Sequence, residues 1–150
     1  DLDWLEVLSK YPNLNYYKWV NQSKKQIFIL TVAAEIENIH YLITSLSDWH
    51  FHLAAPCFCS EPLTSLSQYS NVTVYQNVLH SKVDWLLDDS IVYLDINHYV
   101  ETMNILSRAK ERNKKIFAFD TTRKSQDDSL YDGIFSINNP EQMVEAIKKL

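Results

Sequence analysis

Chemically versatile side chains gather in one short stretch, Asp95-Ile96-Asn97-His98, between an apolar run and an amphipathic segment. A carboxylate, an amide and an imidazole can exchange hydrogen bonds with a hydroxyl group, and the imidazole can also transfer a proton. Glu101 adds a second carboxylate shortly afterwards. In open α/β sheets, ligands bind beyond the carboxyl ends of the strands. If a buried strand ends at Asp95, this stretch predicts a ligand-binding crevice.

A purely structural role explains the same residues. Asn97 has the side chain of a helix N-cap, and Asp95 would stabilise that helix N-terminus through the macrodipole. His98 would then only form hydrogen bonds with its neighbours. The residue types alone leave both interpretations open.

Two more candidates come from other predicted strands of the same sheet. Thr31 lies near the end of the first strand, and Asp120 ends the fifth and begins the sequence Asp120-Thr121-Thr122. Because parallel strands end at one edge of a sheet, these side chains would lie near the polar stretch. The candidate ligand-binding residues are therefore Thr31, Asp95, Asn97, His98, Glu101 and Asp120. No catalytic set of Ser, His and Asp has a spacing that singles it out.

The elements that position these residues alternate between strand and helix. Continuous apolar runs predict buried strands, and apolar residues at helical spacing predict helices between them. The predicted strands are 26–33, 49–55, 71–77, 90–96, 114–120 and 133–137, and the predicted helices are 35–48, 61–69, 81–89, 98–113 and 139–150. This alternation predicts an α/β, Rossmann-like, parallel six-stranded sheet with helices on both faces, in the order 3-2-1-4-5-6.

The domain division follows from the same pattern. Residues 26–150 form the predicted Rossmann-like domain, and residues 1–25 form a connecting segment before it. That segment contains Trp4, Tyr11, Tyr16, Tyr17 and Trp19. Large aromatic side chains are enriched in interface cores, so several of them are expected to pack against another domain or a partner.

Composition excludes several kinds of ligand. The chain has 150 residues and one glycine, Gly133, where average usage predicts roughly ten. A dinucleotide fingerprint and a P-loop both need several glycines, so neither is present. The net charge of -5 argues against nucleic acid as a partner. Carboxylates at the predicted edge, with no Lys or Arg before Arg108, would repel a diphosphate. We therefore expect no cofactor and, at most, weak binding of a UDP-sugar.

The cysteines and the hydropathy indicate where the protein acts. Cys57 and Cys59 form a C-x-C pair, a spacing that bridges poorly within a strand, so free thiols are expected and a metal site is not. No apolar run approaches the roughly 20 residues that cross a bilayer. We expect no signal peptide, because the sequence opens on Asp1-Leu2-Asp3-Trp4 without a basic stretch. A cytoplasmic location is expected, peripheral to the membrane if the protein works beside an export system.

Residues 26–150 resemble the C-terminal Rossmann domain of GT-B glycosyltransferases. The segment VYLDINHYVETMNILSRAKERNKKIFAFD is similar to bacterial glycosyltransferase-like proteins that glycosylate serine-rich adhesins of the accessory Sec system. The segments FHLAAP (51–56) and YSNVTVYQNV (69–78) fit the same layout. In that system an active glycosyltransferase pairs with a GT-B-shaped stabilising subunit, and the YLDINH stretch is most similar to that subunit.

The resemblance implies three alternative functions. The first is a non-catalytic subunit that stabilises a catalytic glycosyltransferase and helps it hold a Ser/Thr-rich protein acceptor. The second is the UDP-sugar-binding domain of an active GT-B enzyme, and the third is a Rossmann-like interaction module. Active retaining enzymes carry a glutamate after strand 4, which Glu101 matches, and a second acid two turns later. The sequence has Ser107, Arg108 and Ala109 there, which favours the first alternative.

Overall fold

The computed structural model describes residues 25–150, and the predicted segment 1–25 lies almost entirely outside that range. The aromatic partner surface predicted there also lies outside the described residues. The described chain forms one parallel sheet in the order β3-β2-β1-β4-β5-β6. The predicted strand order and the predicted neighbourhood of β1 and β4 are both confirmed, with Ile27 paired to Val92.

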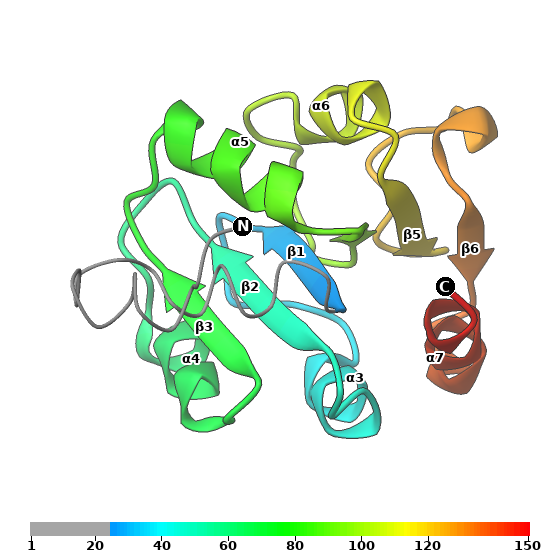
Figure 1. Ribbon diagram of the computed structural model, residues 1–150, viewed down its shortest axis with the longest axis horizontal. Coiled ribbons are helices and arrows are strands. Elements are labelled where there is room, and N and C mark those ends of the chain that lie inside the picture. Colours follow the sequence, from blue (N-terminus) through cyan, green and yellow to red (C-terminus); the bar gives the residue numbers. More distant parts are fainter. Residues whose placement is uncertain (1–24) are drawn as a thin grey trace, which may run out of the picture.

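The strands are short, and helices or 3-10 turns separate most of them (Figure 1). The strands are β1 (Gln26–Leu30), β2 (His50–Ala54), β3 (Val72–Tyr75), β4 (Val92–Asp95), β5 (Lys115–Phe119) and β6 (Gly133–Phe135). The helices are α3 (Ile39–Ser45), α4 (Glu61–Thr64), α5 (His80–Asp89), α6 (Ile105–Glu111) and α7 (Pro140–Lys148), with 3-10 turns η1 (Ser65–Gln68) and η2 (Asp128–Leu130).

Helices cover both faces of the sheet, which explains why β1 and β4 are apolar on both sides. Alternate strand residues point to opposite faces, so Ile27 and Ile29 join one core and Phe28 and Leu30 the other. The first core is covered by α3, α4 and α7, and the second by α5 and α6 (Figure 1). Each fully buried large apolar side chain contributes about 1.5–3 kcal/mol, so these two cores fix the positions of the strand ends.

Two predicted helices begin later than the sequence pattern indicates. The helix predicted at 35–48 starts at Ile39, and the one predicted at 98–113 starts at Ile105. In both cases the residue before the helix, Asn38 or Asn104, has a left-handed backbone with φ near 50°. Before α3, Ile36 packs into the core from an irregular loop, whereas Tyr99 and Val100 before α6 are exposed. The alternative interpretation, in which Asn97 caps the helix after β4, is therefore wrong.

Asparagine takes the conformational role that glycine has in other chains. Of six non-glycine residues with positive φ in the described chain, four are asparagines, a residue type that tolerates this region. The other two, Tyr99 and Met103, lie in the loop between β4 and α6. Gly133 itself does not have a positive φ.

A search of the described helices for one that is both long enough and apolar enough to cross a membrane finds none.

Candidate functional site

The carboxylate of Asp95 lies at the end of β4 and is almost completely buried, with 1% exposure. The side-chain ammonium of Lys124 donates to Asp95 Oδ1 at 2.8 Å. The Lys124 backbone N–H and the Tyr131 hydroxyl donate to Asp95 Oδ2 at 2.8 and 2.7 Å. Burial raises the pKa of Tyr131, so this hydroxyl keeps its proton and acts as a donor. All the hydrogen bonds that this carboxylate accepts in the described chain therefore come from within the domain.

Lys124 is held as tightly as its partner. Its ammonium also donates to the carbonyl oxygens of Asn97 and Thr122, and its side chain is only 7% exposed. The Thr122 hydroxyl donates to the Asp95 carbonyl at 2.8 Å, which joins the loops after β4 and β5 a second time. The expectation that no cation lies near the polar stretch is wrong, because Lys124 reaches it from the neighbouring loop. This cation is already satisfied by three oxygen atoms.

The position of Lys124 in the sequence could have indicated its role. In the predicted strand order, the loops after β4 and β5 are neighbours, so a lysine just beyond β5 can reach a carboxylate at the end of β4. A buried carboxylate needs such a partner, because an isolated buried charge is very costly.

The position beyond the carboxyl ends of β1 and β4, which we name the mouth, is closed by backbone pairing between the loops that follow these strands. Ile36 and Asn97 form an isolated antiparallel bridge between the loops that follow these strands. Glu37 N–H donates to the Ile96 carbonyl at 2.9 Å, and His98 N–H donates to the Glu35 carbonyl at 3.0 Å. This is the place where the strand order reverses and where a ligand crevice is usual. Here the two loops contact each other instead of separating.

A side-chain hydrogen bond reinforces this closure. His98 Nε2 lies 2.7 Å from Glu37 Oε1, and both side chains are about one-third exposed. Asn97 is buried, and its Oδ1 atom has no hydrogen-bond partner among the described residues. Its Nδ2 atom is 3.5 Å from the carbonyl of His98. The polar stretch is thus engaged mainly within the domain.

Glu101 caps the N-terminus of α6, a role that one interpretation of the sequence gave to Asn97. Its Oε2 atom accepts a hydrogen bond from the Leu106 N–H at 2.8 Å, in the first turn of α6. Between Asn97 and α6, Tyr99 and Met103 have positive φ, which costs about 1–2 kcal/mol for each residue. The predicted correspondence of Glu101 to a catalytic glutamate is not required to explain its position.

The two remaining candidates have local partners. Thr31 is fully buried, and its hydroxyl donates to the Ala33 carbonyl at 2.6 Å. Asp120 is exposed at the end of β5 and accepts a hydrogen bond from Ile137 N–H at 3.3 Å. The structure brings Asp95, Asn97 and His98 together at the closed mouth. A ligand-binding role for the six candidates stays a prediction.

Exposed apolar side chains surround this edge of the sheet. Five of the eight exposed large apolar residues in the described chain lie in the loops after β1 to β4: Val32, Phe58, Leu79, Tyr99 and Val100. We name these five residues the apolar rim. The loops contact one another, since Cys57 Sγ lies 3.8 Å from the Val32 carbonyl and Asn77 N–H donates to the Cys57 carbonyl at 3.0 Å. Exposed apolar residues gathered on one edge are typical of a surface that contacts another protein.

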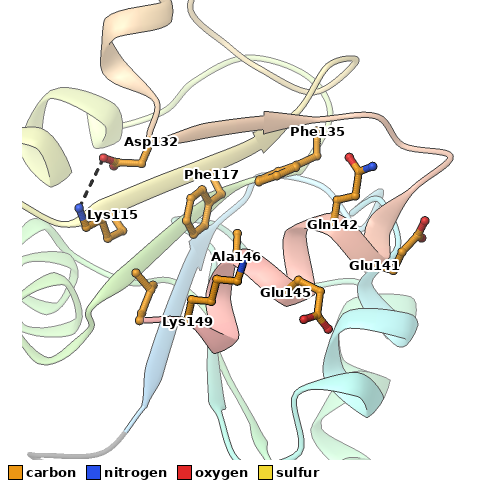
Figure 2. Close-up of a pocket in the computed structure, with 10 residues that line it drawn as sticks. Lys115, Phe117, Asp132, Phe135, Glu141, Gln142, Glu145, Ala146 and Lys149 are labelled. Atoms are coloured by element: carbon orange, nitrogen blue, oxygen red, sulfur yellow. Dashed lines mark ion pairs between the residues drawn. The ribbon is translucent and has the colours of Figure 1, made fainter.

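A separate groove of about 590 Å³ lies between the β5–β6 end of the sheet and α7 (Figure 2). The Phe117 and Phe135 rings lie on its sheet side, and Glu141, Gln142 and Glu145 come from α7 (Figure 2). None of the six predicted site residues lines this groove. No pattern in the sequence predicted this groove.

The chain matches a known protein family over nearly all of its described length. A family described as the GftB/GlyA-F C-terminal domain matches residues 27–150. Glycosyltransferase GlyF of Streptococcus pneumoniae is 62% identical over 150 residues, which are 100% of this chain and 38% of GlyF. GtfB of Streptococcus agalactiae, named as the stabilizing protein of a UDP-N-acetylglucosamine–peptide N-acetylglucosaminyltransferase, is 41% identical over 93% of this chain and 31% of its own length.

Solved structures agree with the fold. The crystal structure of the glycosyltransferase GlyE from Streptococcus pneumoniae has a TM-score of 0.79 at 29% identity, covering 96% of this chain and 41% of that chain. The GtfA/B complex bound to UDP and GlcNAc has a TM-score of 0.75 at 31% identity, covering 84% of this chain and 28% of that chain. The chain therefore spans well under half the length of these relatives.

Proposed function

Because the chain belongs to the GftB/GlyA-F C-terminal domain family, we propose that it is the Rossmann-like C-terminal part of a glycosyltransferase-like protein that acts in O-glycosylation. The acceptor in this proposal is a Ser/Thr-rich bacterial surface protein. The domain itself performs no chemistry: it stabilises an active glycosyltransferase and helps it to hold the acceptor. The name of the Streptococcus agalactiae relative, a stabilizing protein, supports this role.

The closed mouth between β1 and β4 is the main support for a non-catalytic role. A diphosphate is held by free cations or by convergent backbone N–H groups. The cation at this edge, Lys124, is engaged by Asp95 and two carbonyl oxygens. The N–H groups of Glu37 and His98 are engaged by carbonyl oxygens across the bridge. Nucleotide-sugar binding there would require several of these interactions to break.

The apolar rim supports the partner part of the proposal. Phe58, Leu79 and Val100 are each more than 70% exposed, on loops that rigid strands position. Burying such side chains in an interface contributes roughly 25 cal/mol for each Å² of apolar surface. We place contact with the rest of the glycosylation machinery at this rim.

A cytoplasmic location belongs to the same proposal. Cys57 and Cys59 are free thiols, and burial raises the pKa of Cys59, which lowers its reactivity. Free thiols are usual in a reducing compartment. No cofactor is proposed for this domain.

The second candidate is a UDP-sugar-binding domain of an active enzyme. One observation favours it: the 62% identical relative is named a glycosyltransferase, not a stabilizing protein. If this candidate holds, Glu101 would contact the donor sugar, and the bridge at Ile36 and Asn97 would open in the complete enzyme.

One experiment separates the two candidates. The full-length protein that contains this domain is co-expressed with the catalytic glycosyltransferase and a Ser/Thr-rich acceptor, and sugar transfer and the melting temperature of the glycosyltransferase are measured. In the non-catalytic role, Glu101→Gln leaves transfer within about twofold, because glutamine still accepts the Leu106 hydrogen bond. Val100→Asp, which places a charge on the apolar rim, lowers both sugar transfer and the melting temperature of the glycosyltransferase. Loss of transfer in Glu101→Gln with an unchanged melting temperature would support the donor-binding candidate instead.

A further inference from the structure

The sheet ends at β6, which has a neighbouring strand on one side only within the described chain. β5 pairs with β6 in parallel from Phe117–Gly133 to Phe119–Phe135. Because backbone groups of a strand alternate in direction, an edge strand presents unpaired N–H and C=O groups. An extended peptide can pair with such an edge, while its alternate side chains enter a neighbouring groove.

The groove beside β6 has an apolar base that such side chains could contact. The Phe117 and Phe135 rings pack edge to face with centroids 5.7 Å apart. Gly133 makes this arrangement fit, since a Cβ atom at that position would lie 2.8 Å from the Phe135 ring. Phe117 is buried, whereas Phe135 is partly exposed toward the groove (Figure 2). Phe135 is thus the apolar surface available to a peptide side chain.

The charged side chains that line the groove favour one kind of peptide. At one end, Lys115 Nζ is paired with Asp132 at 3.8 Å, as the dashed line in Figure 2 shows. On the α7 side, Glu141 and Glu145 lie one helical turn apart and form no ion pair in the described structure. Lys149, on the same side of the groove as Lys115 in Figure 2, is the one unpaired cation among the described lining residues. Two unpaired carboxylates against one ammonium favour a basic segment.

We propose that the groove between β6 and α7 binds an extended, basic segment of a partner protein, which adds to the sheet as a strand beside β6. On the face toward α7, one of its apolar side chains packs on Phe135, and Lys or Arg side chains two residues away on the same face pair with Glu141 and Glu145. This site lies apart from the apolar rim and does not depend on the proposed function.

The test uses nuclear magnetic resonance on the isotope-labelled full chain, titrated with two eight-residue peptides. One has lysine and valine in turn at every second position, with threonine between them, and the matched peptide has glutamate in place of lysine. The lysine peptide is expected to shift the amide signals of Gly133 to Phe135 and of α7, and to protect at least one more β6 amide from hydrogen exchange. The glutamate peptide is expected to shift none of them.

Two variants make the test specific. Glu141→Gln with Glu145→Gln should weaken binding of the lysine peptide about fivefold, because two exposed ion pairs are lost. Glu111→Gln, which removes an exposed carboxylate on α6, is the matched control and should leave the affinity unchanged. The proposal is overturned if β6 and α7 signals do not move at millimolar peptide, if both peptides act alike, or if the double variant and the control lose equal affinity.

Discussion

At the scale of single residues, Asp95 shows how a stretch that looked like a ligand site forms an internal anchor. Its position at the carboxyl end of a central strand could be predicted from the apolar run before it. Its partners could not, because Lys124 and Tyr131 lie about thirty residues away in sequence and reach it only through loop conformations. Residue type and topology predicted where the polar residues gather. They did not predict that these residues would satisfy one another.

Removing the cation tests the anchor directly. Lys124→Met leaves the Asp95 carboxylate buried without its charge partner, which costs about 3–5 kcal/mol of unfolding free energy. Urea denaturation measures this loss, and Lys148→Met on the exposed face of α7 is the control. A loss below about 1 kcal/mol would show that the pair contributes little.

His52 makes stability depend on pH. Desolvation by burial, with smaller contributions from His50 and Lys82, lowers its pKa from 6.5 to about 3. The side chain is 3% exposed and contacts the Tyr75 hydroxyl at 2.9 Å and the Gln26 amide oxygen. Below pH 6.5 the imidazole of His52 is protonated in the unfolded chain but stays neutral in the folded chain. The free energy of unfolding therefore falls as the pH decreases toward the folded pKa of about 3.

We expect the unfolding free energy to fall by about 2 kcal/mol between about pH 7 and about pH 5 through this residue. In His52→Gln, most of this dependence should disappear, and the remainder would come from His50, whose pKa burial also lowers. Urea denaturation at a series of pH values measures it, with His40→Gln on the exposed side of α3 as control. An unchanged slope in His52→Gln would refute the assignment.

At the scale of elements, the type and order of the strands followed from the sequence, and the helix starts did not. Apolar runs fix buried strands because both faces of the sheet are covered. Helical spacing of apolar residues, by contrast, continued through the loops before α3 and α6. There Asn38 and Asn104 have left-handed backbones that begin the helices late. Ile36 shows that a loop can bury a residue of the periodic pattern, whereas Tyr99 and Val100 fit the pattern and remain exposed.

Helices α5 and α6 are joined by a charge cluster whose loss should be measurable. Asp84 Oδ1 accepts from Arg108 at 2.6 Å and from Arg112 at 2.7 Å. The Arg108 hydrogen bond is the main reason that the pKa of Asp84 is lowered, so this contribution is present at neutral pH and lost as pH falls through the lowered value. Asp84→Ala should cost about 1 kcal/mol, and less at high salt.

Asp88→Ala is the matched comparison, because the Asp88 side chain pairs with Arg112 alone among residues 25–150 and is more exposed. The loss of unfolding free energy in Asp88→Ala, measured by urea denaturation, should be smaller than in Asp84→Ala. Equal losses for the two variants would contradict the central place of Asp84.

Gly133 is needed for space and not for backbone conformation. An added Cβ would lie 2.8 Å from Phe135 and 3.0 Å from Phe117, so Gly133→Ala must displace the ring pair. Overpacking of this kind costs about 1–3 kcal/mol. Thermal denaturation of Gly133→Ala, Phe135→Leu and the double variant would show it, since the smaller side chain should relieve most of the cost. If the stability losses of the two single variants add up in the double variant, the Phe135 ring is not the reason that position 133 needs glycine.

At the scale of the whole molecule, the domain has a Rossmann-like sheet whose usual ligand position is closed and whose carboxyl edge carries the apolar rim. The single glycine of the sequence already excluded phosphate-binding loops. Closure of the β1–β4 mouth could not be predicted, because it depends on pairing between two irregular loops. Together these features indicate an edge suited to contact with protein rather than with a diphosphate.

Calorimetric titration of the chain with UDP, UDP-glucose and UDP-N-acetylglucosamine tests this central claim most directly. The account predicts no binding heat up to millimolar ligand, because Lys124 and the loop N–H groups are already engaged. Glu101→Ala and Glu101→Gln should behave like the unmodified chain in this titration. Sub-micromolar binding of a UDP-sugar that is lost in both Glu101 variants would contradict the account and identify the edge as a working donor site.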